Sequence, residues 1–164
     1  MKTLFIMRHA KSSWDDSSLS DFVRPLNGRG EKAAPLMGEF MRKNSLEPSV
    51  IISSPAVRAK QTAKLMKKAA GFECELTFDE RIYEATPGTL LQVVSDINDA
   101  LSSAMLVGHN PGMEGLIRVL TGESEDMPTA ALAVIDLDID KWSDVGGECG
   151  SLQNIFRPKE LTSW

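Results

Sequence analysis

Two histidines and two arginines are the residues of this chain best suited to handling a phosphoryl group. His9 directly follows Arg8, His109 directly follows a glycine, and Arg58 lies between them along the chain. A neutral imidazole can attack phosphorus and hold it covalently, and a planar guanidinium binds two phosphoryl oxygens while keeping its charge. With one ring attacking and the other donating to phosphoryl oxygens, the set needs no metal. The expected chemistry is phosphoryl transfer.

Three short apolar runs are expected to bring these residues to one edge of a sheet. Leu4–Met7, Val50–Ile52 and Met105–Val107 predict buried strands, and stretches of helical period alternate with them. This alternation favours a single α/β domain over residues 1–164, with a mostly parallel central sheet between two helix layers. Ligands of such sheets bind beyond the carboxyl ends of the strands, which is where the arginines and histidines are expected.

Local signals predict where two of the helices begin. Asn27 is expected to cap a helix reaching about Asn44, with Pro35 bending that helix or shifting its start. Ser54 as N-cap and the proline after it are expected to begin the helix that carries Arg58 in its first turn. Further helices are expected over 90–101 and 113–120, and further strands over 75–78, 131–137 and 150–156.

Composition and charge narrow the class of protein. The chain has 164 residues, enough for one domain with its own core, and a net charge of −5 from 18 Lys+Arg against 23 Asp+Glu. That charge argues against a general binder of nucleic acid or of anionic membranes. No apolar run has the length of a transmembrane helix or a signal-peptide core, so a cytoplasmic location is expected. No metal-ligand spacing is visible, so neither a metal nor another cofactor is expected.

Four motifs, in order along the chain, resemble the histidine phosphatase superfamily, which includes phosphoglycerate mutases and acid phosphatases. They are Arg8-His9-Ala10-Lys11-Ser12, Asn27-Gly28-Arg29-Gly30, Ser53-Ser54-Pro55-Ala56-Val57-Arg58 and Gly108-His109-Asn110-Pro111. The likeness runs from Leu4 to at least Leu137 and implies a phosphoglycerate mutase-like fold. It also implies His9 as the nucleophile and Arg58 and His109 as phosphate ligands, beside Arg8. Lys11 and Asn110, within the same motifs, are candidate substrate contacts.

The first motif points to one branch of the superfamily. It reads Arg-His-Ala-Lys where mutases usually have Arg-His-Gly-Glu, so the chain looks closest to the small phosphohistidine phosphatases. The span 71–103 has room for about one strand and one helix, which leaves little for the lid of larger members. A shallow, open site suits a phosphohistidine on a signalling or phosphotransfer protein. A small-molecule phosphomonoesterase or mutase of this fold, and a non-catalytic phosphoprotein-binding module, stay as alternatives.

The general acid is the role that the sequence determines least. Family enzymes that act on phosphate esters use a carboxylic acid to protonate the leaving oxygen. Glu84 is the candidate by position, with Asp15 and Asp16 in the polar loop 10–27 as alternatives. A phosphohistidine can leave as a protonated imidazole, which relaxes this requirement. The sequence does not determine whether the loop 10–27 closes over the site, and Lys11 fits a solvent-facing charge as well as a substrate contact.

Overall fold

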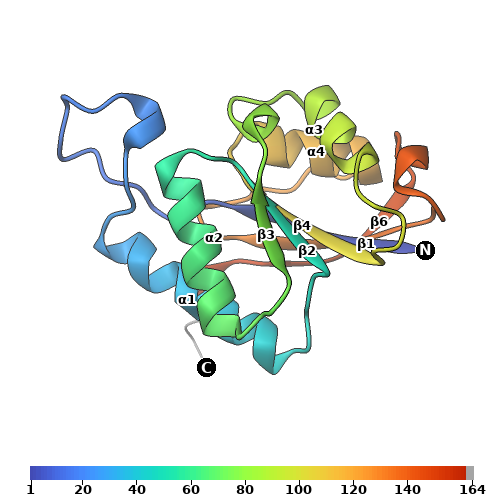
Figure 1. Cartoon of the computed structure of the whole chain (residues 1–164), viewed down its shortest axis with the longest axis horizontal. Helices are drawn as coiled ribbons and strands as arrows, with labels where there is room; N and C mark the ends of the chain where they lie inside the picture. The colour runs from blue at the N-terminus through green and yellow to red at the C-terminus, as the bar shows by residue number, and fades with distance from the viewer. Residues whose placement is uncertain (162–164) are drawn as a thin grey trace.

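A six-stranded sheet lies between two helix layers in the computed structural model, which describes residues 1–161 (Figure 1). The strands are β1 (Lys2–Arg8), β2 (Val50–Ser53), β3 (Glu75–Phe78), β4 (Ser103–Gly108), β5 (Leu132–Leu137) and β6 (Gly150–Phe156). Their order in the sheet is β3-β2-β4-β1-β5-β6. The first four are parallel, whereas β5 runs antiparallel to β1 and β6 antiparallel to β5. The predicted, mostly parallel α/β architecture is confirmed.

Helices cover both faces of this sheet. α1 (Gly28–Lys43) and α2 (Val57–Ala70) pack on one face, and α3 (Pro87–Ser95) and α4 (Gly112–Thr121) pack on the other (Figure 1). The remaining helical segments are α5 (Pro158–Leu161) and the 3-10 turns η1 (Asp21–Val23), η2 (Glu80–Ile82) and η3 (Trp142–Asp144). None of the helices within residues 1–161 is long and apolar enough to cross a bilayer.

The central strands divide their side chains between two cores. In β1, Leu4 and Ile6 belong to the core under α3 and α4, whereas Phe5 and Met7 belong to the core under α1 and α2. Successive side chains of a strand point to opposite faces, so both faces of β1 are buried. This two-sided burial explains why the sequence shows continuous apolar runs rather than an alternation of apolar and polar residues.

The start of α1 agrees with its prediction. The Asn27 side chain accepts a hydrogen bond from the Gly30 N–H, and the helix runs from Gly28 with Pro35 inside it, so its start is not shifted. The helix predicted over 90–101 is displaced, since α3 spans Pro87–Ser95. Its last predicted turn lies instead in the connection to β4.

The predicted start of α2 is wrong. The helix begins at Val57 with Ala56 as its N-cap residue, and no side chain caps it. Ser54 accepts a hydrogen bond from the Ala56 N–H at 3.2 Å, but its hydroxyl also contacts the ring of His109. The Ser54 hydroxyl thus takes part in a tertiary contact with His109 instead of capping the helix, as local rules had predicted. Arg58 nevertheless lies in the first turn, as expected.

Two connections bear on access to the site. Between α2 and β4 the chain forms only β3, η2 and α3, so the prediction of little or no lid in this span is confirmed. The loop 10–27 extends from the end of β1, at the edge of the sheet where the parallel strands terminate (Figure 1). An isolated bridge between Ser12 and Leu26 joins its two ends, and η1 lies between them.

Candidate active site

The four predicted side chains converge at the carboxyl ends of parallel strands. Arg8 ends β1 and His9 follows it, His109 follows β4, and Arg58 lies in the first turn of α2 after β2. β1 and β4 are paired in register, with Arg8 opposite Gly108, so the rings of His9 and His109 come to a centroid distance of 5.1 Å. Hydrogen bonding between these neighbouring strands therefore sets the spacing of the two rings.

His9 is held as a neutral ring with one nitrogen free. Its Nδ1 lies 2.7 Å from the carbonyl oxygen of Ala10, and because a carbonyl only accepts, Nδ1 carries the proton. Burial lowers the pKa of His9 to about 3, and the nearby charges of His109, Arg58 and Arg8 act in the same direction. At neutral pH the ring is uncharged and Nε2 keeps its lone pair, which is the form that can attack phosphorus.

The peptide that holds His9 is itself fixed by Thr62. The Ala10 N–H donates to Thr62 Oγ1 at 2.9 Å, and that hydroxyl donates to the carbonyl of Arg58 at 2.7 Å. Thr62 is fully buried and joins the segment after β1 to the helix that carries Arg58. Sequence reasoning missed it, although it lies one helical turn after Arg58 and hence on the same face.

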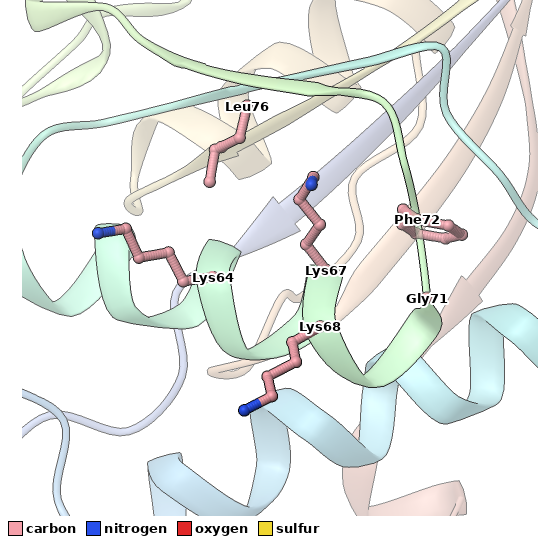
Figure 2. Close-up of a pocket in the computed structure, with 6 residues that line it drawn as sticks. All are labelled: Lys64, Lys67, Lys68, Gly71, Phe72 and Leu76. Atoms are coloured by element: carbon pink, nitrogen blue, oxygen red, sulfur yellow. The ribbon is translucent and has the colours of Figure 1, made fainter.

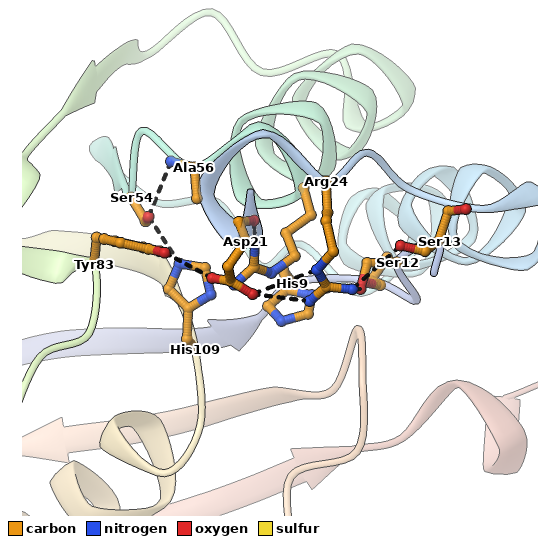
Figure 3. Close-up of polar contacts among 11 residues, drawn as sticks. His9, Ser12, Ser13, Asp21, Arg24, Ser54, Ala56, Tyr83 and His109 are labelled. Carbon is orange, nitrogen blue, oxygen red and sulfur yellow. Dashed lines mark hydrogen bonds and ion pairs between the residues drawn. The ribbon is translucent and has the colours of Figure 1, made fainter. Parts of the chain in front are cut away.

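His109 packs between two rings and a hydroxyl. Its centroid lies 5.1 Å from that of His9 and 5.6 Å from that of Tyr83, and its Nε2 lies 2.8 Å from Ser54 Oγ (Figure 3). Burial lowers the pKa of His109 to about 4, and Arg58 adds to this effect. The Ser54 hydroxyl can donate to Nε2, which leaves the ring proton on Nδ1 as a hydrogen-bond donor.

Three buried nitrogens in this cluster lack a hydrogen-bond partner. They are Nε of Arg8, Nε of Arg58 and Nδ1 of His109, and within residues 1–161 no other buried side-chain nitrogen or oxygen is unpaired. An unpaired buried polar group costs about 1–3 kcal/mol, so three in one place call for a functional explanation. A tetrahedral oxyanion offers enough lone pairs for all three, and the residues concerned are those predicted to bind phosphate.

A carboxylate that sequence analysis did not select closes the site (Figure 3). Oδ2 of Asp21, in η1, lies 2.9 Å from Arg58 Nη2 and accepts a hydrogen bond from the Tyr83 hydroxyl at 2.6 Å. Arg58 Nη1 also donates to the backbone carbonyl of Asp21, at 2.6 Å. The Tyr83 hydrogen bond, followed by Arg58 and Arg24, lowers the pKa of Asp21 to about 2 despite its partial burial. The loop 10–27 therefore does cover the site, and it brings a fixed negative charge to Arg58.

Arg24 anchors this loop and was also missed. It is only 6% exposed, donates to Ser12 Oγ at 3.0 Å, and contacts Oδ1 of Asp21 at 3.2 Å. Its guanidinium lies 3.4 Å from the centroid of the Trp14 ring. A signal was present in the sequence, because an arginine flanked by Val23 and a proline is unusual in a loop otherwise rich in serine and aspartate.

The remaining candidates lie at the edge of the cluster. The Lys11 and Glu84 side chains are exposed and make no hydrogen bond or ion pair with the described residues; Glu84, next to Tyr83, has a positive φ of 54°. Asn110 donates from Nδ2 to the Met127 carbonyl at 2.9 Å and accepts from the Glu114 N–H at 3.3 Å, so its amide supports the start of α4. The predicted substrate contacts of Lys11 and Asn110, and the predicted role of Glu84 as general acid, stay predictions.

The two aspartates proposed as alternative acids lie outside this cluster. Asp15 and Asp16 are exposed, and Asp16 hydrogen-bonds Ser18 rather than an arginine of the site. Asp21 is the residue of this loop that reaches Arg58. Within the described part of the chain, no group of three or more His, Cys, Asp or Glu side chains is placed to hold a metal ion.

Known proteins similar to this chain share most of its length. A sequence model described as "Histidine phosphatase superfamily (branch 1)" matches residues 4–124. Protein Rv1276c of Mycobacterium tuberculosis (strain ATCC 25618 / H37Rv) is 32% identical over 93% of this chain and 100% of its own. The "Probable phosphoglycerate mutase GpmB" of Salmonella paratyphi A is 32% identical over 81% of this chain and 62% of its own. The crystal structure of the "putative phosphohistidine phosphatase SixA from Agrobacterium tumefaciens" superposes with a TM-score of 0.83 at 27% identity, over 96% of this chain and 98% of that one.

Proposed function

The chain belongs to the histidine phosphatase superfamily, and we propose that it removes phosphoryl groups from phosphohistidine on a protein through a covalent phospho-His9 intermediate. The observation that carries the proposal is the state of His9, whose Nδ1–H is bound by the Ala10 carbonyl while Nε2 stays free. The unpaired N–H donors of Arg8, Arg58 and His109 support it, since they can donate hydrogen bonds to the phosphoryl oxygens.

In the first step the Nε2 lone pair of His9 attacks phosphorus. The P–Nε2 bond forms as the P–N bond of the substrate breaks, and the leaving imidazole departs with a proton taken up on its released nitrogen. The guanidinium groups of Arg8 and Arg58 balance the charge on the equatorial phosphoryl oxygens, and His109 donates a hydrogen bond to them. The Nδ1–H of His9 stays hydrogen-bonded to the Ala10 carbonyl in both steps, so the orientation of the ring does not change.

In the second step water attacks phosphorus opposite the P–Nε2 bond. That bond breaks, its electron pair returns to Nε2 of His9, and inorganic phosphate leaves after water loses a proton to solvent or to a phosphate oxygen. Asp21 is ionised at neutral pH and therefore has no proton to donate. Glu84 stays the candidate acid for ester substrates, because the leaving oxygen of an ester needs a proton from a nearby acid. The leaving imidazole of a phosphohistidine is more basic and can take its proton from solvent.

Exposed apolar side chains around the site support a protein substrate. Trp14, Leu19, Phe22 and Val23, from 37% to 74% exposed, all lie on the loop that carries Asp21 to Arg58. Apolar groups gathered at one rim are typical of a surface that another protein covers. The likeness to SixA of Agrobacterium tumefaciens, named for phosphohistidine, supports the same substrate class.

A small-molecule phosphomonoesterase or mutase is the second candidate function. The 32% identity to GpmB of Salmonella paratyphi A favours it, although this chain spans only 62% of that protein. Under this alternative Glu84 would be essential as the acid for the leaving oxygen. The two functions therefore differ in their dependence on a single exposed carboxylate.

The test compares phosphate release by the wild type and His9→Ala from a protein phosphorylated on histidine and from a sugar phosphate. We expect turnover of the phosphoprotein by the wild type, none by His9→Ala, and incorporation of labelled phosphate only where His9 is present. Lys141→Ala, an exposed change at the opposite edge of the sheet, serves as the control. Turnover of the sugar phosphate alone would favour the second candidate, and equal activity of His9→Ala would exclude the intermediate. Tight binding without turnover would indicate a non-catalytic module.

A further inference from the structure

A row of lysines runs along the exposed face of α2, away from the active site. Lys60, Lys64, Lys67 and Lys68 follow Arg58 at intervals that place them on one face of the helix. The opposite face, which includes Arg58, Thr62 and Met66, is buried against α1 and the sheet. At a rise of about 1.5 Å per residue, Lys64 lies about 9 Å and Lys68 about 15 Å along the axis from Arg58.

These lysines have no acidic partners. None of the four forms an ion pair with a carboxylate of the described residues, although the chain carries a net charge of −5. Lys60, Lys64 and Lys68 are exposed, and Lys67 is half-buried. A net negative protein that keeps four adjacent cations unpaired presents a local field suited to an anionic surface.

The neighbouring strand β3 contributes apolar groups and no competing charge. Leu76 lines a groove of about 400 Å³ with Lys64 and Lys67 (Figure 2). Phe78, two residues on, lies under Lys60 at 5.4 Å from its Nζ. Because strand side chains alternate, Glu75 points to the other face of the sheet. We call the four lysines with Leu76 and Phe78 the lysine face.

We propose that the lysine face docks an acidic surface of the phosphorylated protein substrate, one whose carboxylates lie about 13–18 Å from the phosphorylated histidine, given the separation along the axis and the width of the helix. This inference rests on the proposed function. The lysine row begins at Lys60, in the first turn of α2 next to Arg58 but on the opposite side of the helix. A folded partner that presents its phosphoryl group to Arg58 is wider than the helix, about 10 Å across, and therefore extends past the start of α2 to the lysine face. The apolar parts of Leu76 and Phe78 would bury against the same partner, as at other polar interfaces with an apolar centre.

The test uses two phosphohistidine peptides that differ only in charge. A span of about 13–18 Å corresponds to about four to six extended residues, so one peptide carries four Glu at positions three to six from the phosphohistidine. The other peptide carries Gln at those positions. KM and kcat are measured for both at low and high salt, and p-nitrophenyl phosphate reports the chemistry without docking.

Two charge reversals of equal size are compared. Lys64→Glu with Lys68→Glu alters the lysine face, and Arg118→Glu with Lys141→Glu alters exposed residues on α4 and beyond β5. Each pair changes the net charge from −5 by −4, to −9. General repulsion of an acidic peptide is therefore the same in both variants, and only the location of the charge differs.

We expect the wild type to have a KM about 10-fold lower for the Glu peptide than for the Gln peptide at low salt, a ratio that high salt removes. Lys64→Glu with Lys68→Glu should abolish the preference and leave turnover of p-nitrophenyl phosphate unchanged. The Arg118 and Lys141 pair should retain it. Equal KM values for the two peptides with the wild type, or equal loss in both variants, would overturn the proposal.

Failure of the proposed substrate is distinguished by binding. If p-nitrophenyl phosphate is hydrolysed and neither phosphopeptide is, the phosphohistidine assignment fails, and fluorescence anisotropy of the unphosphorylated Glu and Gln peptides then tests the lysine face alone. If the wild type binds the Glu peptide more tightly and Lys64→Glu with Lys68→Glu removes this preference, docking at the lysine face is supported. An RNA oligonucleotide of equal charge that binds the same lysines as tightly would overturn the assignment to an acidic protein.

Discussion

Asp21→Asn should strengthen the binding of a phosphate-like anion, although it removes a contact from the active site. The Asp21 carboxylate lies 2.9 Å from Arg58 Nη2, and the Asp21 backbone carbonyl accepts from Nη1. Both terminal nitrogens of Arg58 are thus engaged before any phosphoryl group arrives. An incoming oxyanion has to share this guanidinium with a negative charge or displace it, and both cost binding free energy.

The size of this effect can be worked from the pKa of Asp21. A fall from the ordinary value of 3.8 to about 2 corresponds to roughly 2.4 kcal/mol in favour of the ionised form, at about 1.36 kcal/mol per unit. The Tyr83 hydrogen bond is the largest cause of the lowered pKa, so Arg58 accounts for only part of this energy. The Asp21 side chain is also 46% exposed, so solvent screens much of it, and we retain about 1 kcal/mol for the contact with Arg58. Asp21→Asn removes the charge and should tighten anion binding about 5-fold.

Tungstate binding, measured by calorimetry at pH 7.5, tests the reasoning. We expect the dissociation constant for Asp21→Asn to be about 5-fold lower than for the wild type. Asp16→Asn is the matched control, because Asp16 lies in the same loop and its side chain hydrogen-bonds only Ser18 among the described residues. Unchanged or weaker tungstate binding by Asp21→Asn would show that Asp21 orients Arg58 for the anion instead of competing with it.

Three further predictions concern stability and metal dependence. The pKa values of His9 and His109 are lowered to about 3 and about 4, so between these values and about 6.5 the unfolded chain binds more protons, and stability falls as pH falls. Each histidine should cost about 2 kcal/mol at pH 5 relative to pH 8, and urea unfolding of His9→Asn with His109→Asn should show a much smaller loss. Gly38→Ala should destabilise the protein by about 2 kcal/mol, since its Cβ would lie 2.3 Å from the Met66 carbonyl where α1 crosses α2; Gly28→Ala, with open space around it, should change the melting temperature little. EDTA should leave phosphatase activity unchanged, and loss of activity that a divalent ion restores would refute the metal-free mechanism.

The sequence was most informative where regular structure positions the chemistry. His9 and His109 each follow a buried strand, and parallel pairing brings the ends of neighbouring strands together, so residue type and position sufficed to predict their meeting. Arg58 was predictable for a similar reason, since it lies in the first turn of the helix after β2. These predictions depended on periodicity, which a single sequence displays.

The loop 10–27 shows where such reasoning ends. Asp21 reaches Arg58 because η1 folds back on α2, and no periodic pattern in a loop indicates which of its aspartates will do so. Ser54 shows a second limit. Its hydroxyl had a plausible local role as a helix cap, but its contact with His109 depends on a strand that follows it by about fifty residues in the chain. Both misses come from tertiary contacts that compete with local rules.

Burial of the two histidines links catalysis to stability. Burial is the largest cause of the lowered pKa of both rings, and neighbouring arginines act in the same direction. The same environment keeps Nε2 of His9 unprotonated at neutral pH and makes the fold sensitive to acid. A substitution that admits water to the rings should raise both pKa values and flatten the fall in stability below pH 6.5, while it weakens the electrostatic hold on the phosphoryl group. A variant of this site that is more stable to acid is therefore expected to turn over its substrate more slowly, because the same buried side chains cause both the acid sensitivity and the hold on the phosphoryl group.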